Sequence, residues 1–350
     1  MTIRSLDGIR GFAVLLVLLS HMSLAGINLF PFMDFSGAGK AGVYLFFALS
    51  AFLLTWQALG PSGAAIASGH YWLGYAIRRV CRIYPLYLVV LISAYTLTHF
   101  TSGYIAKIET LRTIGMHLVL LEGTHIFWAI PVEFKYYLVL PAVCFALHWT
   151  ATRNIALSGA LTLVLVAAGY FLWPPEQSHP NDIRLSPYLA IFFLGSFAAV
   201  ACSRYVDFLN HHANWFSLLG WLSIIGGLAT VPSVWRLLVD PEASNQVFHQ
   251  SFLLYAVIWN VAIVAAFSQH SLFSKFFSLA PCRFLGRISF SVYLWHYPIL
   301  QFINRQLTLE AWAKFILTIT LTIALSFLSY RFLERPFIVW AHGRTSNGRN

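Results

Sequence analysis

Three ionisable side chains lie inside long apolar stretches of the sequence, where they are costly to bury. They are His21, Glu133 and His296. Ionisable groups within membrane-length apolar segments are rare and mark functional sites by default. A neutral imidazole can take a proton from a hydroxyl group, and a nearby carboxylate can stabilise the imidazolium that forms. These residue types predict general base catalysis, and a buried, hydrogen-bonded histidine is the structural alternative.

Helical geometry places these three groups at similar depths. At about 1.5 Å per residue, His21 lies about 18 Å from the start of its segment and His296 about 14 Å. Glu133 lies about 21 Å from the same side of a hydrocarbon core that is about 30 Å thick. Lys135 is two residues from Glu133 and therefore points to another face of the helix. We expect the three groups to share one layer near the midplane.

A charged segment precedes the first histidine, in the sequence IRSLDGIRGFAVLLVLLSH. Asp7 and Arg10 are three residues apart on one helical face and can pair. Ten residues separate Arg10 from His21, which puts the two side chains near the same face, three turns apart. The structural alternative is that Asp7 caps the helix and Arg10 holds it at the inner membrane surface.

A second basic cluster lies in RRVCRIYPLY, which contains Arg78, Arg79 and Arg82. Guanidinium groups bind phosphate through two parallel hydrogen bonds. The cluster therefore predicts a site for a phosphate-bearing ligand that arrives from the cytoplasm. The structural alternative is a set of cytoplasmic anchors of the kind that membrane helices commonly have.

The elements that must position these residues are membrane helices. Of the 350 residues, 59% are apolar and 10% are charged, whereas a typical soluble domain is about 25% charged. This composition excludes an ordinary soluble enzyme, and the abundance of aromatic residues excludes a disordered chain. We expect an all-α, polytopic membrane bundle of about ten transmembrane helices. The expected segments are 9–27, 41–59, 83–100, 127–148, 155–173, 187–203, 215–235, 251–268, 287–304 and 312–331, with a shorter outer half-helix at 111–121.

The distribution of Lys and Arg predicts the orientation. With the N-terminus in the cytoplasm, fourteen of these residues fall on inner segments, seven on outer segments and one, Lys135, within a helix. This bias favours two cytoplasmic termini and explains the net charge of +10 without a nucleic-acid partner. We expect the membrane to be a bacterial inner membrane. We expect one transmembrane domain, 1–336, and a short polar tail, 337–350. The four cysteines form no C-x-x-C pair, and we expect no disulfide and no metal site.

Six motifs occur in order along the chain and resemble those of the acyltransferase-3 family of integral membrane O-acyltransferases. The motifs occupy residues 4–21, 42–55, 78–87, 128–141, 285–300 and 334–337. The resemblance is to the stand-alone type, without a fused esterase-like domain. It implies transfer of an acyl group, most simply acetyl, from acyl-CoA to a hydroxyl of a sugar, glycan, polyol or small natural product.

The resemblance also implies roles for individual residues. The catalytic residues carry over to His21, Arg10 and Glu133. We add Asp7 to the catalytic set, because it can pair with Arg10 at the start of the first helix. The acyl-CoA site carries over to Arg78, Arg79 and Arg82. The acceptor is expected to contact His296, Trp128 and Tyr137.

Several positions depart from the family pattern. Many members have Asp where this chain has Tyr44 and Gly where it has Ala51. Ala129 replaces a Ser after the motif's Trp, and Phe134 replaces a second Glu. We therefore expect the acceptor side of the site to differ from that of common members. A transporter or flippase of a lipid-linked sugar would use the same buried polar layer and is the first alternative function. A structural or sensing subunit without chemistry is the second.

Overall fold

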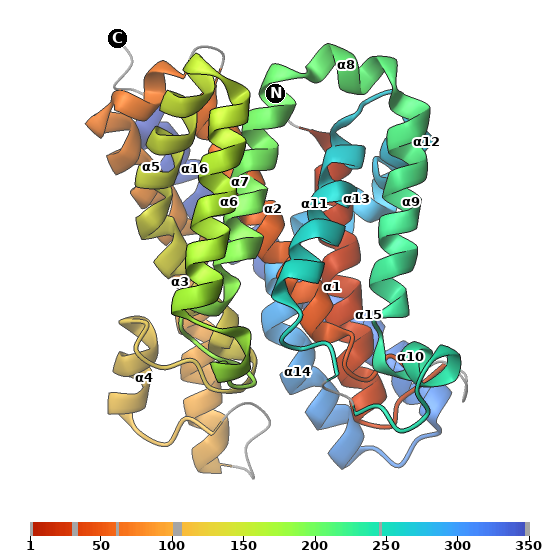
Figure 1. Ribbon diagram of the computed structural model, residues 1–350. Coiled ribbons are helices and arrows are strands. Elements are labelled where there is room, and N and C mark those ends of the chain that lie inside the picture. The colour runs from red at the N-terminus through yellow and green to blue at the C-terminus, as the bar shows by residue number, and fades with distance from the viewer. Residues whose placement is uncertain (1–2, 30–33, 61–62, 101–106, 245–246, 347–350) are drawn as a thin grey trace.

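The computed structural model describes residues 3–29, 34–60, 63–100, 107–244 and 247–346, which form an all-helical bundle without strands (Figure 1). Each of the ten expected segments contains a helix. The ten helices are α1 (Arg4–Leu24), α2 (Gly39–Leu59), α3 (Gly69–Phe100), α5 (Ala129–Arg153), α6 (Ile155–Leu172), α7 (Leu189–Arg204), α9 (Ala213–Ala229), α11 (Phe252–Phe267), α14 (Ser289–Gln306) and α15 (Ala311–Ser329). The predicted all-α membrane bundle is confirmed.

Most of these helices can cross a bilayer unaided. In the part of the chain that the structure describes, seven helical stretches are long and apolar enough to span, and a bent pair adds an eighth if it is one span. The remaining two of the ten expected segments contain α11, which has 16 residues, and α14, which has 18. The protein is therefore a multi-pass integral membrane protein.

Three segments differ from their predicted form. The segment 215–235 is not one straight helix, because α9 and α10 (Pro232–Leu238) meet at an angle of 88°, and Pro232 begins α10. Helix α3 begins at Gly69, so the arginine cluster lies inside the helix and not at its start. The expected polar tail is helical up to Ser346, as α16 (Arg335–Ser346), and follows a π-helical turn, η5 (Tyr330–Glu334).

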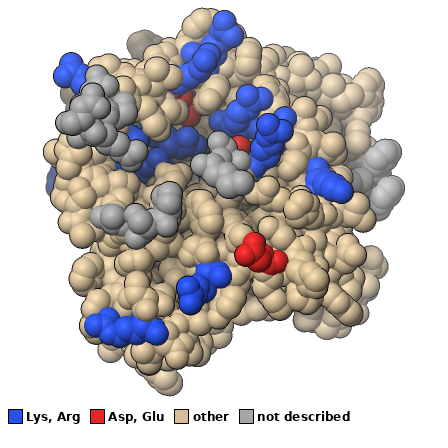
Figure 2. Space-filling view, turned by 90° about the horizontal axis from the view of Figure 1, so that it is seen from above, with Lys and Arg blue, Asp and Glu red and all other residues tan. Residues whose placement is uncertain are grey.

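Both chain ends lie on one face of the bundle, at the top of Figure 1. We call it the terminal face and the opposite side the distal face. The distal face has α10 and α4 (Leu111–Leu118), which is the predicted half-helix. Figure 2 looks onto the terminal face, where basic side chains predominate over acidic ones. The assignment of this face to the cytoplasm stays a prediction.

Helix α1 packs without side-chain spacers against the segment that precedes α14. A Cβ atom added at Gly286, in α13 (Ala280–Arg287), would lie 1.7 Å from the Asp7 carbonyl oxygen. A Cβ atom at Gly8 would lie 1.8 Å from the Phe277 carbonyl oxygen. Only hydrogen atoms fit at these two contacts, so glycine fixes the position of the charged end of α1.

Candidate active site

Two histidines from distant parts of the sequence meet inside the bundle. His21 lies near the end of α1, and His296 lies in α14. The Nδ1 atom of His21 and the Nε2 atom of His296 are 3.2 Å apart. His296 is fully buried. The predicted proximity of His21 and His296 is therefore present in the structure.

The surrounding carbonyl groups select the tautomer of each neutral ring. The Nδ1 atom of His21 lies 3.0 Å from the Val17 carbonyl oxygen, and the Nδ1 atom of His296 lies 3.1 Å from the Val292 carbonyl oxygen. A carbonyl oxygen only accepts, so each Nδ1 atom must have the proton. The single Nδ1–H of His21 is then shared between two acceptors, the Val17 carbonyl oxygen and the Nε2 atom of His296. By elimination, the Nε2 atom of His21 has an unshared electron pair and can act as a base.

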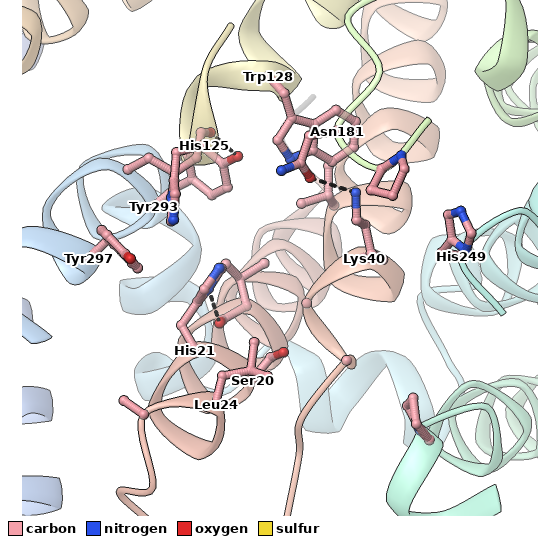
Figure 3. A pocket seen from close by; sticks show the side chains of 18 of the residues that line it. Ser20, His21, Leu24, Lys40, His125, Trp128, Asn181, His249, Tyr293 and Tyr297 are labelled. Atoms are coloured by element: carbon pink, nitrogen blue, oxygen red, sulfur yellow. Dashed lines mark hydrogen bonds between the residues drawn. The ribbon is translucent and has the colours of Figure 1, made fainter. Parts of the chain in front are cut away.

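His21 lines a cavity of about 570 Å³ in the distal half of the bundle, which we call the histidine cavity (Figure 3). His296 does not line this cavity and lies behind His21. On one side of the cavity are His125, Tyr293 and Tyr297. The volume falls in the range of about 300–1,000 Å³ that is usual for small-molecule sites.

Two residues of the cavity wall have left-handed backbone conformations. His125 has φ +52° and Asn181 has φ +61°. Such conformations cost on the order of 1–3 kcal/mol in a residue other than glycine and concentrate at functional sites. His125 begins η2 (His125–Trp128), the 3₁₀ turn that also places Trp128 in the cavity wall. The expected acceptor contact Trp128 therefore lies in the same cavity as His21.

A second cavity, of about 250 Å³, lies nearer the terminal face, and we call it the arginine cavity. Its wall includes Arg10 from α1 and Arg79 and Arg82 from α3. Arg10 Nη1 donates to Asp7 Oδ1 at 3.3 Å, which is the predicted pair. The Nε atom of Arg79 is buried and has no hydrogen-bond partner among the described residues. This cavity therefore presents guanidinium donors to a ligand.

Glu133 lines the arginine cavity, not the histidine cavity. Its carboxylate accepts hydrogen bonds from the Ser50 hydroxyl and from the Tyr137 hydroxyl, the latter at 2.5 Å. The structure therefore does not bring Glu133 to His21, and it places the expected acceptor contact Tyr137 beside Glu133. Of the predicted catalytic carboxylates, Asp7 and Glu133 both lie among the arginines.

The two cavities adjoin each other. Val43 and Tyr293 are part of both walls. The Tyr293 hydroxyl donates to the Ile126 carbonyl oxygen at 2.5 Å, and this bond ties the shared wall to the η2 turn. A group bound in the arginine cavity therefore lies next to the histidine cavity, with one tyrosine and one valine between them.

Like His296, the residues Arg78 and Tyr44 lie outside both cavity walls. Arg78 donates to the Thr345 hydroxyl at 3.0 Å and so joins α3 to α16. Tyr44 is buried, and its hydroxyl donates to the His249 carbonyl oxygen at 2.6 Å. The tyrosine that replaces the family's usual Asp therefore holds the chain segment before α11, and His249 itself lines the histidine cavity.

The sequence analysis did not single out several residues of the histidine cavity. They are Lys40, His125, Asn181, Tyr293 and Tyr297. Lys40 had the clearest signal, because a lysine in the first turn of a helix opposes the helix dipole. His125 and Asn181 lie in short connections without a periodic pattern, where sequence alone gives no side-chain direction.

Comparisons with known proteins agree with this architecture. A family model described as an acyltransferase domain matches residues 3–331. O-acetyltransferase OatA of Staphylococcus aureus is 25% identical over 368 aligned positions, which cover 95% of this chain and 56% of that protein. Peptidoglycan O-acetyltransferase OatA of Listeria monocytogenes is 24% identical over 362 positions, which cover 95% and 55%. The chain thus spans little more than half the length of these relatives.

No solved structure is significantly similar to this one. The family match, by contrast, extends from the start of α1 to η5 and includes every helix that lines the two cavities. It confirms the predicted family relationship. The chain belongs to the acyltransferase-3 family of integral membrane O-acyltransferases.

Proposed function

We propose that this protein transfers an acyl group, acetyl in the simplest case, from acyl-CoA to a hydroxyl of a glycan. The observation behind the proposal is the pair of adjoining cavities, one lined by arginines and the other by His21. Acyl transfer from CoA needs both a site for phosphates and a base near the acceptor hydroxyl. The related proteins named above are O-acetyltransferases, and the name of one specifies peptidoglycan.

The arginine cavity suits the donor. Arg79 and Arg82 line this cavity and would bind CoA phosphates through their guanidinium groups. Apolar side chains of α2, including Phe46 and Phe47, line the same cavity and suit the pantetheine arm. The thioester would then lie near Tyr293, at the junction with the histidine cavity.

The chemistry follows from the tautomer of His21. The acceptor hydroxyl oxygen attacks the thioester carbonyl carbon while the Nε2 atom of His21 takes the hydroxyl proton. The new ester C–O bond forms, the acyl C–S bond breaks, and the thiolate of CoA receives the proton from His21. In an alternative route the acyl group is first transferred to the same Nε2 atom, as a transient acyl-histidine.

The predicted orientation gives the two cavities different access. If the terminal face is cytoplasmic in a bacterial inner membrane, the donor reaches Arg79 and Arg82 from the cytoplasm. The acceptor then reaches the histidine cavity from the distal, extracytoplasmic side. In oriented proteoliposomes, acetyl-CoA on the terminal side should acetylate a glycan supplied only on the distal side. Product that forms only when both substrates share one side would contradict this arrangement.

The donor site is tested by binding and turnover of radiolabelled acetyl-CoA on the purified protein. Loss of one charge-assisted hydrogen bond should weaken acetyl-CoA binding about ten- to a hundredfold in Arg79→Ala or Arg82→Ala. Arg→Lys should restore little, since lysine lacks the planar fork. Arg153→Ala is the matched control, because Arg153 is exposed and lies outside both cavities. Failure of the wild-type protein to bind acetyl-CoA would leave the transporter and the structural subunit, which a substrate-flux assay in liposomes separates.

A further inference from the structure

The histidine cavity has an unusual charge. Among its described lining residues, Lys40 is the only lysine or arginine, and none is an aspartate or glutamate. Lys40 is half-buried at the second residue of α2. A cation in the first turn of a helix is disfavoured by the helix dipole, so helix stability does not explain this lysine.

Two neighbours fix the position of the ammonium group. Lys40 Nζ donates to Asn181 Oδ1 at 2.7 Å and lies 4.4 Å from the centre of the Trp128 ring (Figure 3). Asn181 tolerates its left-handed backbone better than most residues, since its short polar side chain can bond locally. Asn181 and Trp128 therefore act as positioning residues for a cation inside the cavity.

The Asp182 carboxylate, which follows Asn181 in the chain, is paired with Arg184. Asp182 Oδ2 lies 2.6 Å from Arg184 Nη2, and Arg184 Nε also bonds to both carboxylate oxygens. Burial by itself would raise the pKa of Asp182, but the hydrogen bonds and charge of Arg184 outweigh it and keep that pKa below its ordinary value. None of the ion pairs among the described residues includes Lys40. An ammonium group has three N–H donors, and Asn181 uses one of them.

We propose that the acceptor is an anionic saccharide, whose carboxylate or phosphate pairs with Lys40 while one of its hydroxyls reaches His21. The inference rests on the proposed function, because it takes the histidine cavity as the acceptor site. His21 and Lys40 line the same cavity of about 570 Å³, so one small saccharide can contact both. Because the described cavity wall has the Lys40 ammonium group and no carboxylate, it disfavours a cationic acceptor. A neutral acceptor could enter, but it would bring no negative charge to pair with the ammonium group.

The experiment measures binding of three matched sugars to the purified full-length protein by calorimetry. The sugars are N-acetylglucosamine, which is neutral, N-acetylmuramic acid, which adds a carboxylate, and N-acetylglucosamine 1-phosphate, which adds a phosphate. The wild-type protein should bind at least one anionic sugar about tenfold or more tightly than the neutral sugar. The tighter of the two anionic sugars identifies the chemical group.

Two variants separate the lysine charge from general effects. Lys40→Met, of similar length, should remove the preference for the anionic sugar, and Lys40→Arg should keep most of it. The control is Lys107→Met, which removes the same charge from an exposed residue outside the cavity wall. Equal binding of neutral and anionic sugars by the wild-type protein, or an unchanged preference in Lys40→Met, would overturn the proposal. A retained preference for the anion without turnover of acetyl-CoA would instead refute the proposed function alone.

Discussion

Replacing the two histidines one at a time should reveal an unequal pair. His21 lines the cavity and has the free Nε2 atom, whereas His296 lies behind it and accepts one hydrogen bond. His21→Ala removes the proposed general base, and general base catalysis typically contributes about 10²–10⁴-fold in rate. We therefore expect kcat for acetyl transfer to fall by about that factor, with little change in acetyl-CoA binding.

The expected loss for His296→Phe is much smaller. This substitution removes the neutral hydrogen bond to His21, worth about 0.5–1.5 kcal/mol, which corresponds to about a 2- to 13-fold loss in rate. It also removes the bond to the Val292 carbonyl oxygen, which does not involve His21. His21 keeps its tautomer, because its Nδ1–H still has the Val17 carbonyl oxygen at 3.0 Å. Phenylalanine keeps a planar ring at this fully buried position but is somewhat larger than imidazole, so the unfolding temperature of the variant must be measured beside its rate.

Single-turnover acetylation with both substrates saturating measures this difference directly. Thermal unfolding of each variant in detergent controls for damage to the bundle. Equal losses of several hundredfold in both variants, with unchanged unfolding temperatures, would refute the assigned tautomer. The two rings would then act as one proton-transfer unit.

Two further predictions concern the elements that position the site. Gly286→Ala should lower the unfolding temperature, since its Cβ would lie 1.7 Å from the Asp7 carbonyl oxygen and overpacking costs about 1–3 kcal/mol or more; Gly69→Ala, with no atom within 4 Å, should leave that temperature unchanged. Burial lowers the pKa of His117 below its ordinary 6.5, and its neutral Nε2 atom accepts from the Thr124 N–H at 3.2 Å. Because the unfolded state binds the extra proton more readily, the local structure should lose stability as pH drops below about 6.5. Hydrogen exchange measures this loss as weaker protection of the Thr124 amide, after correction for the intrinsic exchange rate. His117→Gln should remove the pH dependence.

The helices could be predicted from the sequence because apolar run length decides them. Each of the ten expected segments contains a helix. The predicted segments differ from the helices where the length of an apolar run does not determine the course of the chain. The chain bends by 88° between α9 and α10, where Pro232 begins the second helix. Hydropathy does not predict this bend, because both helices are apolar. Helix α3 is longer than predicted, because its polar first half packs against α16 and needs no apolar run.

The site could be predicted only in part, because the position of a residue along a helix gives its depth in the membrane but not the direction of its side chain or its neighbours. His21 and His296 do meet. Glu133 was expected with them and lies instead among the arginines, since the rotation of α5 about its own axis depends on packing partners such as Ser50. His125 lies in a short turn without a periodic pattern of apolar residues, so the sequence does not predict that its side chain faces the cavity.

The spacing between Arg10 and His21 gains a physical meaning from the two cavities. Eleven residues of α-helix rise about 16 Å and return to nearly the same face. One face of α1 therefore contributes Arg10 to the arginine cavity and His21 to the histidine cavity. Under the proposed function, the rigid helix would fix the distance between the phosphate end of the donor site and the base for the acceptor hydroxyl. Because Gly8 and Gly286 hold α1 by backbone contacts, that distance does not depend on flexible side chains.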